Sequence, residues 1–252
     1  PDAVYRLTQR SADIPLHLPR PLLAYGNGRS YGDVCLTEQG TLLLTRGLDR
    51  FISFDEQNGI LRCEAGITLQ EILELIVPRG WFLPVTPGTR MSTVGGAVSN
   101  DVHGKNHHTS GTFCHHVRCL ELWRSDGSII ECGPEKHQQW FEATVGGLGL
   151  TGLIRWVEFG LIPIENPWMR VESRRFANLD EFWTLNHQLE SRWQYTVAWI
   201  DCLASGNARG RGLMLAADHA AAQGELPKFK ERRRRVPINP SFSLVNGITL
   251  RA

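Results

Sequence analysis

Residues 86–108 read TPGTRMSTVGGAVSNDVHGKNHH, and this stretch says more about the fold than any other part of the chain. Small, hydroxylated and amide side chains dominate it. Small side chains let the main chain approach a ligand closely, so a long run of them suits a backbone that wraps a large, flat, polar molecule. The stretch therefore predicts a site for a bulky cofactor.

Two further glycine-rich tracts flank this one. Residues 26–33 read GNGRSYGD and residues 144–152 read TVGGLGLTG; with residues 86–108 we call them the first, third and second tracts. In the first tract, glycines let backbone N–H groups converge, while Arg29 and Ser30 add donors suited to a diphosphate. A tight turn at Asn27-Gly28 fits the same local pattern and remains an alternative interpretation of the first tract. The Rossmann fingerprint lacks its third glycine here, and a P-loop lacks its Gly-Lys-Ser/Thr.

The composition indicates an ordinary globular protein. The chain has 252 residues, 42% hydrophobic and 21% charged, which is enough for one large or two modest domains. Lys and Arg number 27 against 26 Asp and Glu, so the net charge gives no argument for nucleic-acid binding. No apolar run approaches the roughly 18 residues of a membrane span, and no charged-then-apolar leader opens the chain. We expect a cytoplasmic protein, soluble or peripheral at the membrane.

Cysteine and histidine usage argues against structural metal. Six scattered cysteines without a C-x-x-C pair predict reduced thiols. The histidines gather near Cys114, at positions 103, 107, 108, 115 and 116. A shared helical face for His103 and His107 would suit a metal, but the neighbouring glycines oppose a helix and no glutamate supplies the base of a zinc protease. We expect no metal; histidines bonded to the backbone of a crowded loop are the alternative.

Local patterns predict short strands, one well-marked helix and a hairpin. Thr68 and Glu71 form a capping box, apolar residues follow at helical spacing, and Gly80 is placed to end the helix. The hairpin arms are residues 117–124 and 129–132, which turn at 125–128. Other strands are expected at 21–24, 41–44, 60–63 and 153–164.

A domain boundary is expected where Pro163 and Pro167 punctuate the chain, which gives domains 1–166 and 167–252. The second domain should hold a helix over 178–191 and strands over 194–203 and 212–218. The residues expected to face inward from that helix are Leu179, Phe182, Trp183 and Leu189. The sum is an α+β fold.

The three tracts together, in this order and at this spacing, resemble the decaprenylphosphoryl-β-D-ribose 2′-oxidases of the vanillyl-alcohol-oxidase superfamily. The resemblance is dense from Pro21 to Ile164 and thinner through residues 195–201. It implies a PCMH-type FAD-binding domain of two subdomains, followed by the start of an α+β substrate domain built on an antiparallel sheet. In this family, further substrate-contacting and catalytic residues, another lysine among them, lie downstream of Ala252, so the second domain would be incomplete.

The resemblance also implies site residues. FAD would be non-covalent, because neither the first tract nor its flank offers a histidine for a covalent bond. His103, Lys105 and Tyr31 would serve the reaction beside the flavin; the base stays unassigned, and a solvent-facing loop cation is the alternative for Lys105. The expected cofactor-binding residues are Gly26, Asn27, Gly28, Arg29, Ser30, Tyr31, Pro87, Gly88, Thr89, Arg90, Thr93, Gly95, Gly96, Ala97, Asn100, Asp101, His103, Gly149, Gly152 and Ile154.

The implied activity is oxidation of a secondary sugar hydroxyl, the 2′-hydroxyl of a polyprenyl-phosphate ribose, with hydride passing to flavin N5. A quinone or oxygen would accept the electrons, an epimerase-type reductase would be a partner, and cell wall biosynthesis would be the setting. The alternatives are an oxidase of a soluble sugar, alditol or aldonolactone, and a flavin-binding protein without catalysis. The basic run Lys228–Arg235 suggests peripheral contact with anionic lipid, against a solvated loop.

Overall fold

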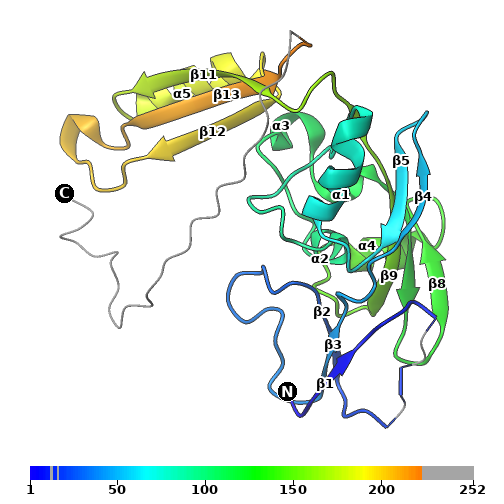
Figure 1. Cartoon of the computed structure of the whole chain (residues 1–252). Helices are drawn as coiled ribbons and strands as arrows, with labels where there is room; N and C mark the ends of the chain where they lie inside the picture. Colours follow the sequence, from blue (N-terminus) through cyan, green and yellow to red (C-terminus); the bar gives the residue numbers. More distant parts are fainter. Residues whose placement is uncertain (12–13, 16, 223–252) are drawn as a thin grey trace, which may run out of the picture. The chain divides into compact units, whose positions relative to one another are not determined.

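The computed structural model describes residues 1–11, 14–15 and 17–222. The chain divides into two compact units, Pro1–Met169 and a second that begins at Arg170 (Figure 1). Helices and sheets are mixed in both, so the expected α+β class is confirmed. The basic run expected to meet a membrane lies outside the described residues.

A five-stranded antiparallel sheet forms the largest part of the first unit. Its strands lie in the order β4-β5-β9-β7-β8, so the strand that comes last in the chain lies in the middle. Val157 of that strand pairs with Cys63 on one side and Leu120 on the other, and all three are fully buried. The strands are β4 Phe51–Asp55, β5 Ile60–Glu64, β7 Val117–Trp123, β8 Ile129–Cys132 and β9 Leu153–Gly160, which confirms the predicted hairpin.

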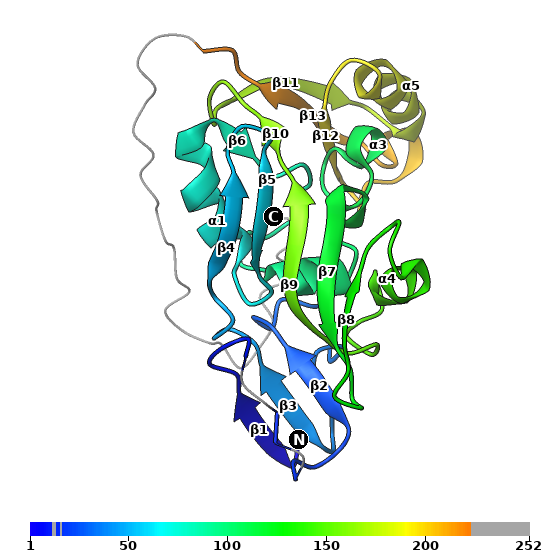
Figure 2. The ribbon, with the colours of Figure 1, turned by 90° about the vertical axis from the view of Figure 1, so that its right-hand side faces the viewer.

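Two helices cover one face of this sheet, α1 (Leu69–Ile76) and α2 (Val94–Ser99) (Figure 2). Burial of their apolar side chains against the strands supplies the main core of the unit. The capping box of α1 forms as predicted: the Thr68 hydroxyl accepts from the Glu71 amide, and the Glu71 carboxylate accepts from the Thr68 amide at 2.7 Å. A 3₁₀ turn, Val77–Arg79, follows, and Gly80 ends it at φ 78°, a left-handed conformation that suits glycine.

A second, smaller sheet belongs to the same unit. Strands β1 (Ala3–Arg6), β2 (Leu22–Tyr25) and β3 (Thr41–Leu44) form a parallel sheet in the order β1-β3-β2. The sequence predicts β2 and β3 as strands but not their parallel pairing. The remaining short elements are β6 Trp81–Phe82, paired with β10 Ile162–Pro163, the helices α3 His107–Ser110 and α4 Gln138–Thr144, and a 3₁₀ turn at Phe113–His116.

The described part of the second unit is a three-stranded sheet with one α-helix. Its strands β11 (Met169–Phe176), β12 (Tyr195–Ile200) and β13 (Gly212–His219) lie in the order β11-β13-β12. The helix α5 (Leu179–Glu190) begins after Asn178, whose side chain accepts from the Glu181 amide at 3.0 Å. A 3₁₀ turn spans Gly206–Ala208. Both predicted strands and the helix of this unit are confirmed.

One inward-facing prediction for α5 is wrong. Trp183 is 57% exposed, while Leu189 is buried among the strand residues Phe176 and Met214. The apolar stripe of the helix runs through Phe182, Leu185 and Leu189, at the i, i+3, i+7 spacing of one face. Trp183 follows Phe182 by one residue, about 100° further round the helix, which turns it to solvent.

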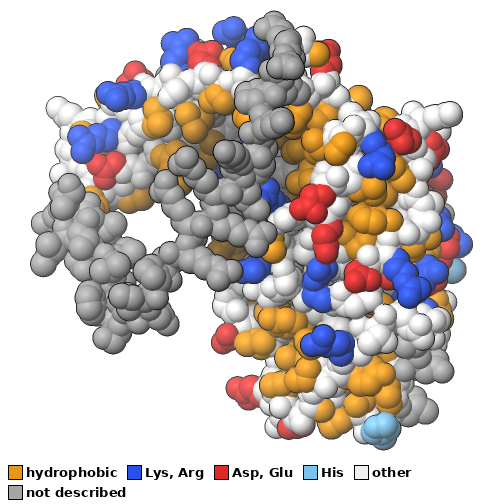
Figure 3. Space-filling view, viewed as in Figure 1, with side chains coloured by type: hydrophobic (Ala, Val, Ile, Leu, Met, Phe, Trp, Pro, Cys, Tyr) orange, Lys and Arg blue, Asp and Glu red, His pale blue; other side chains and the backbone are white. Residues whose placement is uncertain are grey.

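The longest helix among the described residues, α5, has 12 residues. No helix among them is long and apolar enough to cross a bilayer. On the face in Figure 3, acidic and basic side chains are interspersed among the described residues instead of gathering by sign. All six cysteines are free thiols, as predicted.

Candidate functional site

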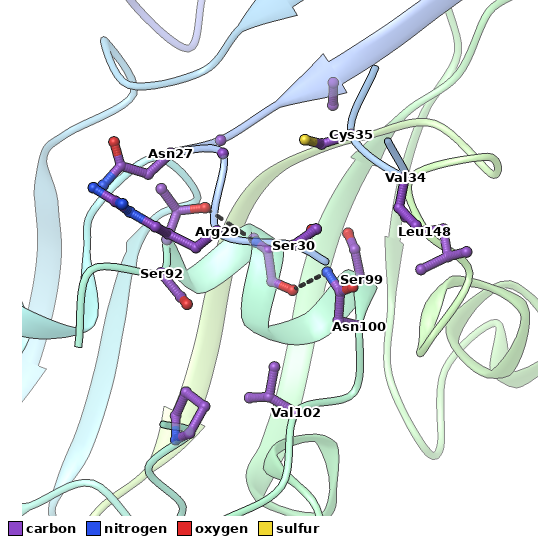
Figure 4. Close-up of a pocket in the computed structure, with 18 of the residues that line it drawn as sticks. Asn27, Arg29, Ser30, Val34, Cys35, Ser92, Ser99, Asn100, Val102 and Leu148 are labelled. Atoms are coloured by element: carbon purple, nitrogen blue, oxygen red, sulfur yellow. Dashed lines mark hydrogen bonds between the residues drawn. The ribbon is translucent and has the colours of Figure 1, made fainter. Parts of the chain in front are cut away.

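The three glycine tracts meet around one cavity of about 760 Å³ in the first unit (Figure 4). That volume falls in the upper part of the range of about 300–1,000 Å³ usual for small-molecule and cofactor sites. The predicted site residues that line it are Gly26, Asn27, Gly28, Arg29, Ser30, Tyr31, Pro87, Gly88, Thr89, Thr93, Gly95, Gly96, Asn100, His103, Lys105, Gly149, Gly152 and Ile154.

Three predicted residues lie outside the cavity lining, each for a local reason. Ala97 faces the core from α2 and has no exposed surface. The Asp101 carboxylate accepts a hydrogen bond from the Cys114 amide at 3.2 Å, which links the chain just after α2 to the 3₁₀ turn Phe113–His116. The Arg90 carbonyl accepts from the Gln70 amide at 2.8 Å, at the start of α1. These residues shape the tract that surrounds the cavity.

Other lining residues escaped sequence reasoning. Six of them lie inside the tracts already quoted, and treating every tract residue as a candidate would have found them: Thr86, Ser92, Ser99, Val102, Gly104 and Leu148. The rest are Ala24, Val34, Cys35, Thr45, Ala65 and Leu153, which reach the cavity through strand pairing and loop packing. Figure 4 labels Val34, Cys35 and Leu148 among the residues that line the cavity.

The first tract packs against the second because glycine leaves room. A Cβ atom on Gly26 would lie 2.5 Å from Oγ1 of Thr93, closer than real Cβ contacts allow. Thr93 is the N-cap of α2, and its Oγ1 accepts from the Gly96 amide at 3.2 Å. Asn27 adds a second link, since its Nδ2 donates to the Met91 carbonyl at 2.8 Å. The two tracts therefore form one continuous backbone wall.

The third tract is held in place from the sheet. Arg124 follows strand β7, donates to the Thr151 carbonyl and lies over the Trp140 ring with its guanidinium carbon 4.1 Å from the centroid. Gly152 has a φ of 149°, and a Cβ there would lie 2.5 Å from the Trp123 carbonyl. The close approach to β7 thus requires glycine.

The charges on the cavity wall suit an anionic ligand. Arg29 and Lys105 are on its wall, and no residue that lines this described cavity is acidic. Gly88 also lines it, and no described residue lies within 4 Å of the place where its Cβ would be, so that space is open to a ligand. An arginine on a glycine-rich wall matches the chemistry of a diphosphate. A dinucleotide cofactor fits these residues.

The predicted reaction residues lie on the wall or at its rim. His103, Lys105 and Tyr31 all line the cavity, and Tyr31 is 97% exposed. The rings of His103 and His107 lie 5.7 Å apart, but α3 begins at His107, so the two do not share a helical face. Among the described residues, no three histidine, cysteine or acidic side chains gather as metal ligands would.

Comparison with known proteins agrees with this geometry. Residues 17–133 match the family described as FAD binding domain. That range covers the first two tracts and the strands that carry them. The chain therefore contains an FAD-binding domain of the PCMH type, as predicted, and FAD is its cofactor.

The relatives point to a particular group of proteins. The chain is similar to the decaprenylphosphoryl-beta-D-ribose oxidase of Mycolicibacterium smegmatis, 32% identical over 244 residues, which is 95% of this chain and 50% of that protein. It is 41% identical over 167 residues to a Streptomyces coelicolor protein described as uncharacterized protein in mprA 5'region, 66% of this chain and 45% of the relative. A putative D-arabinono-1,4-lactone oxidase of Neurospora crassa is 26% identical over 163 residues, 65% of this chain and 29% of the relative. The chain thus spans about half the length of the first two.

Proposed function

We propose that this chain provides the FAD-binding part of an oxidoreductase that oxidises a secondary hydroxyl of a sugar, the 2′-hydroxyl of a polyprenyl-phosphate ribose. The observation that carries the proposal is the position of His103 and Lys105 on the wall of the cavity that the glycine tracts form. Similarity to a decaprenylphosphoryl-ribose oxidase along 95% of the chain supports the choice of substrate.

The roles of the residues follow from their chemistry. When bound, FAD supplies the acceptor for a hydride from the carbinol carbon, at its N5 atom. Arg29, Ser30 and the backbone amides beside them hold the diphosphate. Lys105 supplies a positive charge for a substrate phosphate or for negative charge on the reduced ring. His103 lies on the same wall, where it can take up the hydroxyl proton or orient the hydroxyl.

A second candidate is an oxidase of a soluble sugar, alditol or aldonolactone. The similarity to a putative D-arabinono-1,4-lactone oxidase favours it. In that enzyme Lys105 would meet no substrate phosphate, so its replacement would change turnover more than substrate affinity. Flavin binding without catalysis is the third candidate. Failure of every sugar to reduce the flavin would support it.

Anaerobic stopped-flow absorbance separates the three candidates. The FAD-loaded protein is mixed in turn with a prenyl-phosphate ribose, free ribose, an alditol and an aldonolactone, and loss of oxidised flavin absorbance is followed. We expect bleaching with the prenyl-phosphate ribose and a loss of at least tenfold in its rate with Lys105→Met. Bleaching by the soluble compounds alone would overturn the leading proposal in favour of the second.

The electron acceptor and partners are part of the same proposal. A quinone or oxygen would reoxidise the flavin, and an epimerase-type reductase would take the ketone that oxidation of the 2′-hydroxyl produces, in cell wall biosynthesis. After reduction by substrate, mixing with a quinone analogue or with oxygenated buffer shows which one restores the flavin absorbance faster.

A further inference from the structure

Asn106 is a fully buried polar side chain directly after the residues proposed to meet the substrate. Its Nδ2 donates to the Pro84 carbonyl at 2.7 Å and to the Ser110 hydroxyl at 2.9 Å. Its backbone carbonyl accepts from the Thr109 and Ser110 amides at 3.0 and 2.8 Å, which starts α3. Asn106 itself does not line the cavity, whereas the three residues before it do.

Gly104 makes the matching contact from the other side. A Cβ there would lie 2.8 Å from Asn106 Oδ1, 2.9 Å from the Thr86 carbonyl and 3.1 Å from the Thr86 amide nitrogen. The two ends of the second tract are therefore pressed together. We call the contacts of Asn106 with Pro84 and of Gly104 with Thr86 the tract clamp.

The Asn106 side chain carries a cost that packing alone would not require. Its Oδ1 atom is buried and has no hydrogen-bond partner among the residues that the structure describes. Burying an unpaired polar atom is unfavourable, and an apolar side chain of similar shape would avoid it. The side chain is thus better explained by what its donor group holds than by the stability of the core.

We infer that Asn106 is a positioning residue: through the tract clamp it fixes Lys105 in the cavity wall, so that the flavin environment depends on a side chain outside the cavity. Lys105 follows Gly104 and precedes Asn106, so the two contacts of the clamp flank Lys105 on both sides. The inference rests on the proposed function only in taking Lys105 as a neighbour of the flavin.

The test is a double-mutant cycle on the flavin midpoint potential, measured on the FAD-loaded chain without substrate. Asn106→Leu keeps the size, removes both donated hydrogen bonds and adds no charge. We expect Asn106→Leu and Lys105→Met to lower the midpoint potential, and Asn106→Leu to have little further effect when Lys105 is already replaced, because coupled residues are not additive. An equal shift in both backgrounds, or no shift with Lys105→Met, overturns the inference.

Amide hydrogen exchange gives a readout that needs neither substrate nor flavin reduction. We expect faster exchange over residues 103–105 in Asn106→Leu than in the unchanged protein. The matched control is Asn186→Leu, which loses a hydrogen bond to Glu190 in α5 and should leave exchange over residues 103–105 unchanged. Parent-like exchange in Asn106→Leu overturns the inference. If that variant fails to fold, Gly104→Ala opens the clamp from the other side and carries the same expectations. Should no sugar bleach the flavin, the proposed function fails while both measurements stay interpretable.

Discussion

Thr93 occupies the space that any side chain on residue 26 would need. Its Oγ1 atom lies 2.5 Å from the position of a Cβ on Gly26, and the same atom caps α2 by accepting from the Gly96 amide at 3.2 Å. One atom, Oγ1 of Thr93, therefore both contacts the glycine of the first tract and caps the helix. Disturbing either residue should change the cavity wall.

Gly26→Ala should weaken FAD binding about tenfold, which corresponds to about 1.4 kcal/mol. The new methyl group must displace Thr93, and such overpacking costs about 1–3 kcal/mol. Thr93→Ala removes the obstructing atom but also the cap, at about 1 kcal/mol. The combined loss in the double variant should be smaller than the sum, as measured by FAD titration and thermal unfolding. Strict additivity would contradict the contact.

Gly88→Ala should separate cofactor binding from stability. No described residue lies within 4 Å of the place that its Cβ would take, so the fold should accept the methyl group, and we expect that group to enter the cavity and compete with FAD. We expect an unchanged Tm for the apoprotein and an FAD dissociation constant raised by about tenfold or more. Gly160→Ala is the matched control, because its Cβ also meets open space but lies on β9 away from the cavity lining. Equal FAD affinity in both variants would place the cofactor elsewhere.

Glu71 should make the first unit less stable in acid than at neutral pH. Burial acts to raise the pKa of Glu71, but hydrogen bonds from Arg46 and Thr68 and the charge of Arg46 outweigh it and hold the pKa below its usual value. A depressed pKa adds stability above the unfolded value of about 4.3, and this is lost as pH falls through the folded value.

The charge of Glu71 can be removed by Glu71→Gln. The variant should lose less than about 1 kcal/mol at neutral pH, since the side chain is 40% exposed. The deficit should shrink below about pH 4, as followed by urea unfolding across pH. A deficit that grows with acidity would refute the assignment. Glu74→Gln, on the same helix with a glutamine partner, is the control.

Sequence alone predicts the local elements best where one segment contains the whole signal. The capping box of Thr68 and Glu71 and the left-handed Gly80 are set by neighbouring residues, and both form as expected. The parallel pairing of β1, β3 and β2 depends on long-range contacts and escaped prediction. Trp183 was misplaced because its apolar character was counted without the phase of the helix.

The candidate site shows the same division. The glycine-rich tracts can be recognised from their composition alone, so most of the cavity wall could be predicted. Thr45 and Ala65 line the cavity because strand ends bring them there, and no local pattern marks either residue. Asp101, predicted to bind the cofactor, lies outside the cavity lining, and one of its carboxylate oxygens accepts from the Cys114 amide.

Thiol labelling should report the cavity directly. Burial raises the pKa of Cys63 and Cys114 above the usual range of a thiol, so neither should react in the folded protein. Cys202 is exposed and Cys35 lines the cavity, so both should react in the apoprotein. Saturating FAD should slow labelling of Cys35 at least tenfold and leave Cys202 unchanged, as measured by peptide mass spectrometry. Equal labelling of Cys35 with and without FAD would count against the site.

The central place of β9 also sets an order of events during synthesis. β5 and β7 each pair with β9 and not with each other, so the two hairpins that precede it have no common edge until residues 153–160 leave the ribosome. Until then the nascent chain presents unpaired strand edges, which are sites of aggregation. Leu153 and Ile154 of the same strand line the cavity. A ribosome stalled before this strand emerges would therefore carry a chain without a complete cofactor pocket, and FAD can stabilise the protein only from that point of translation onward.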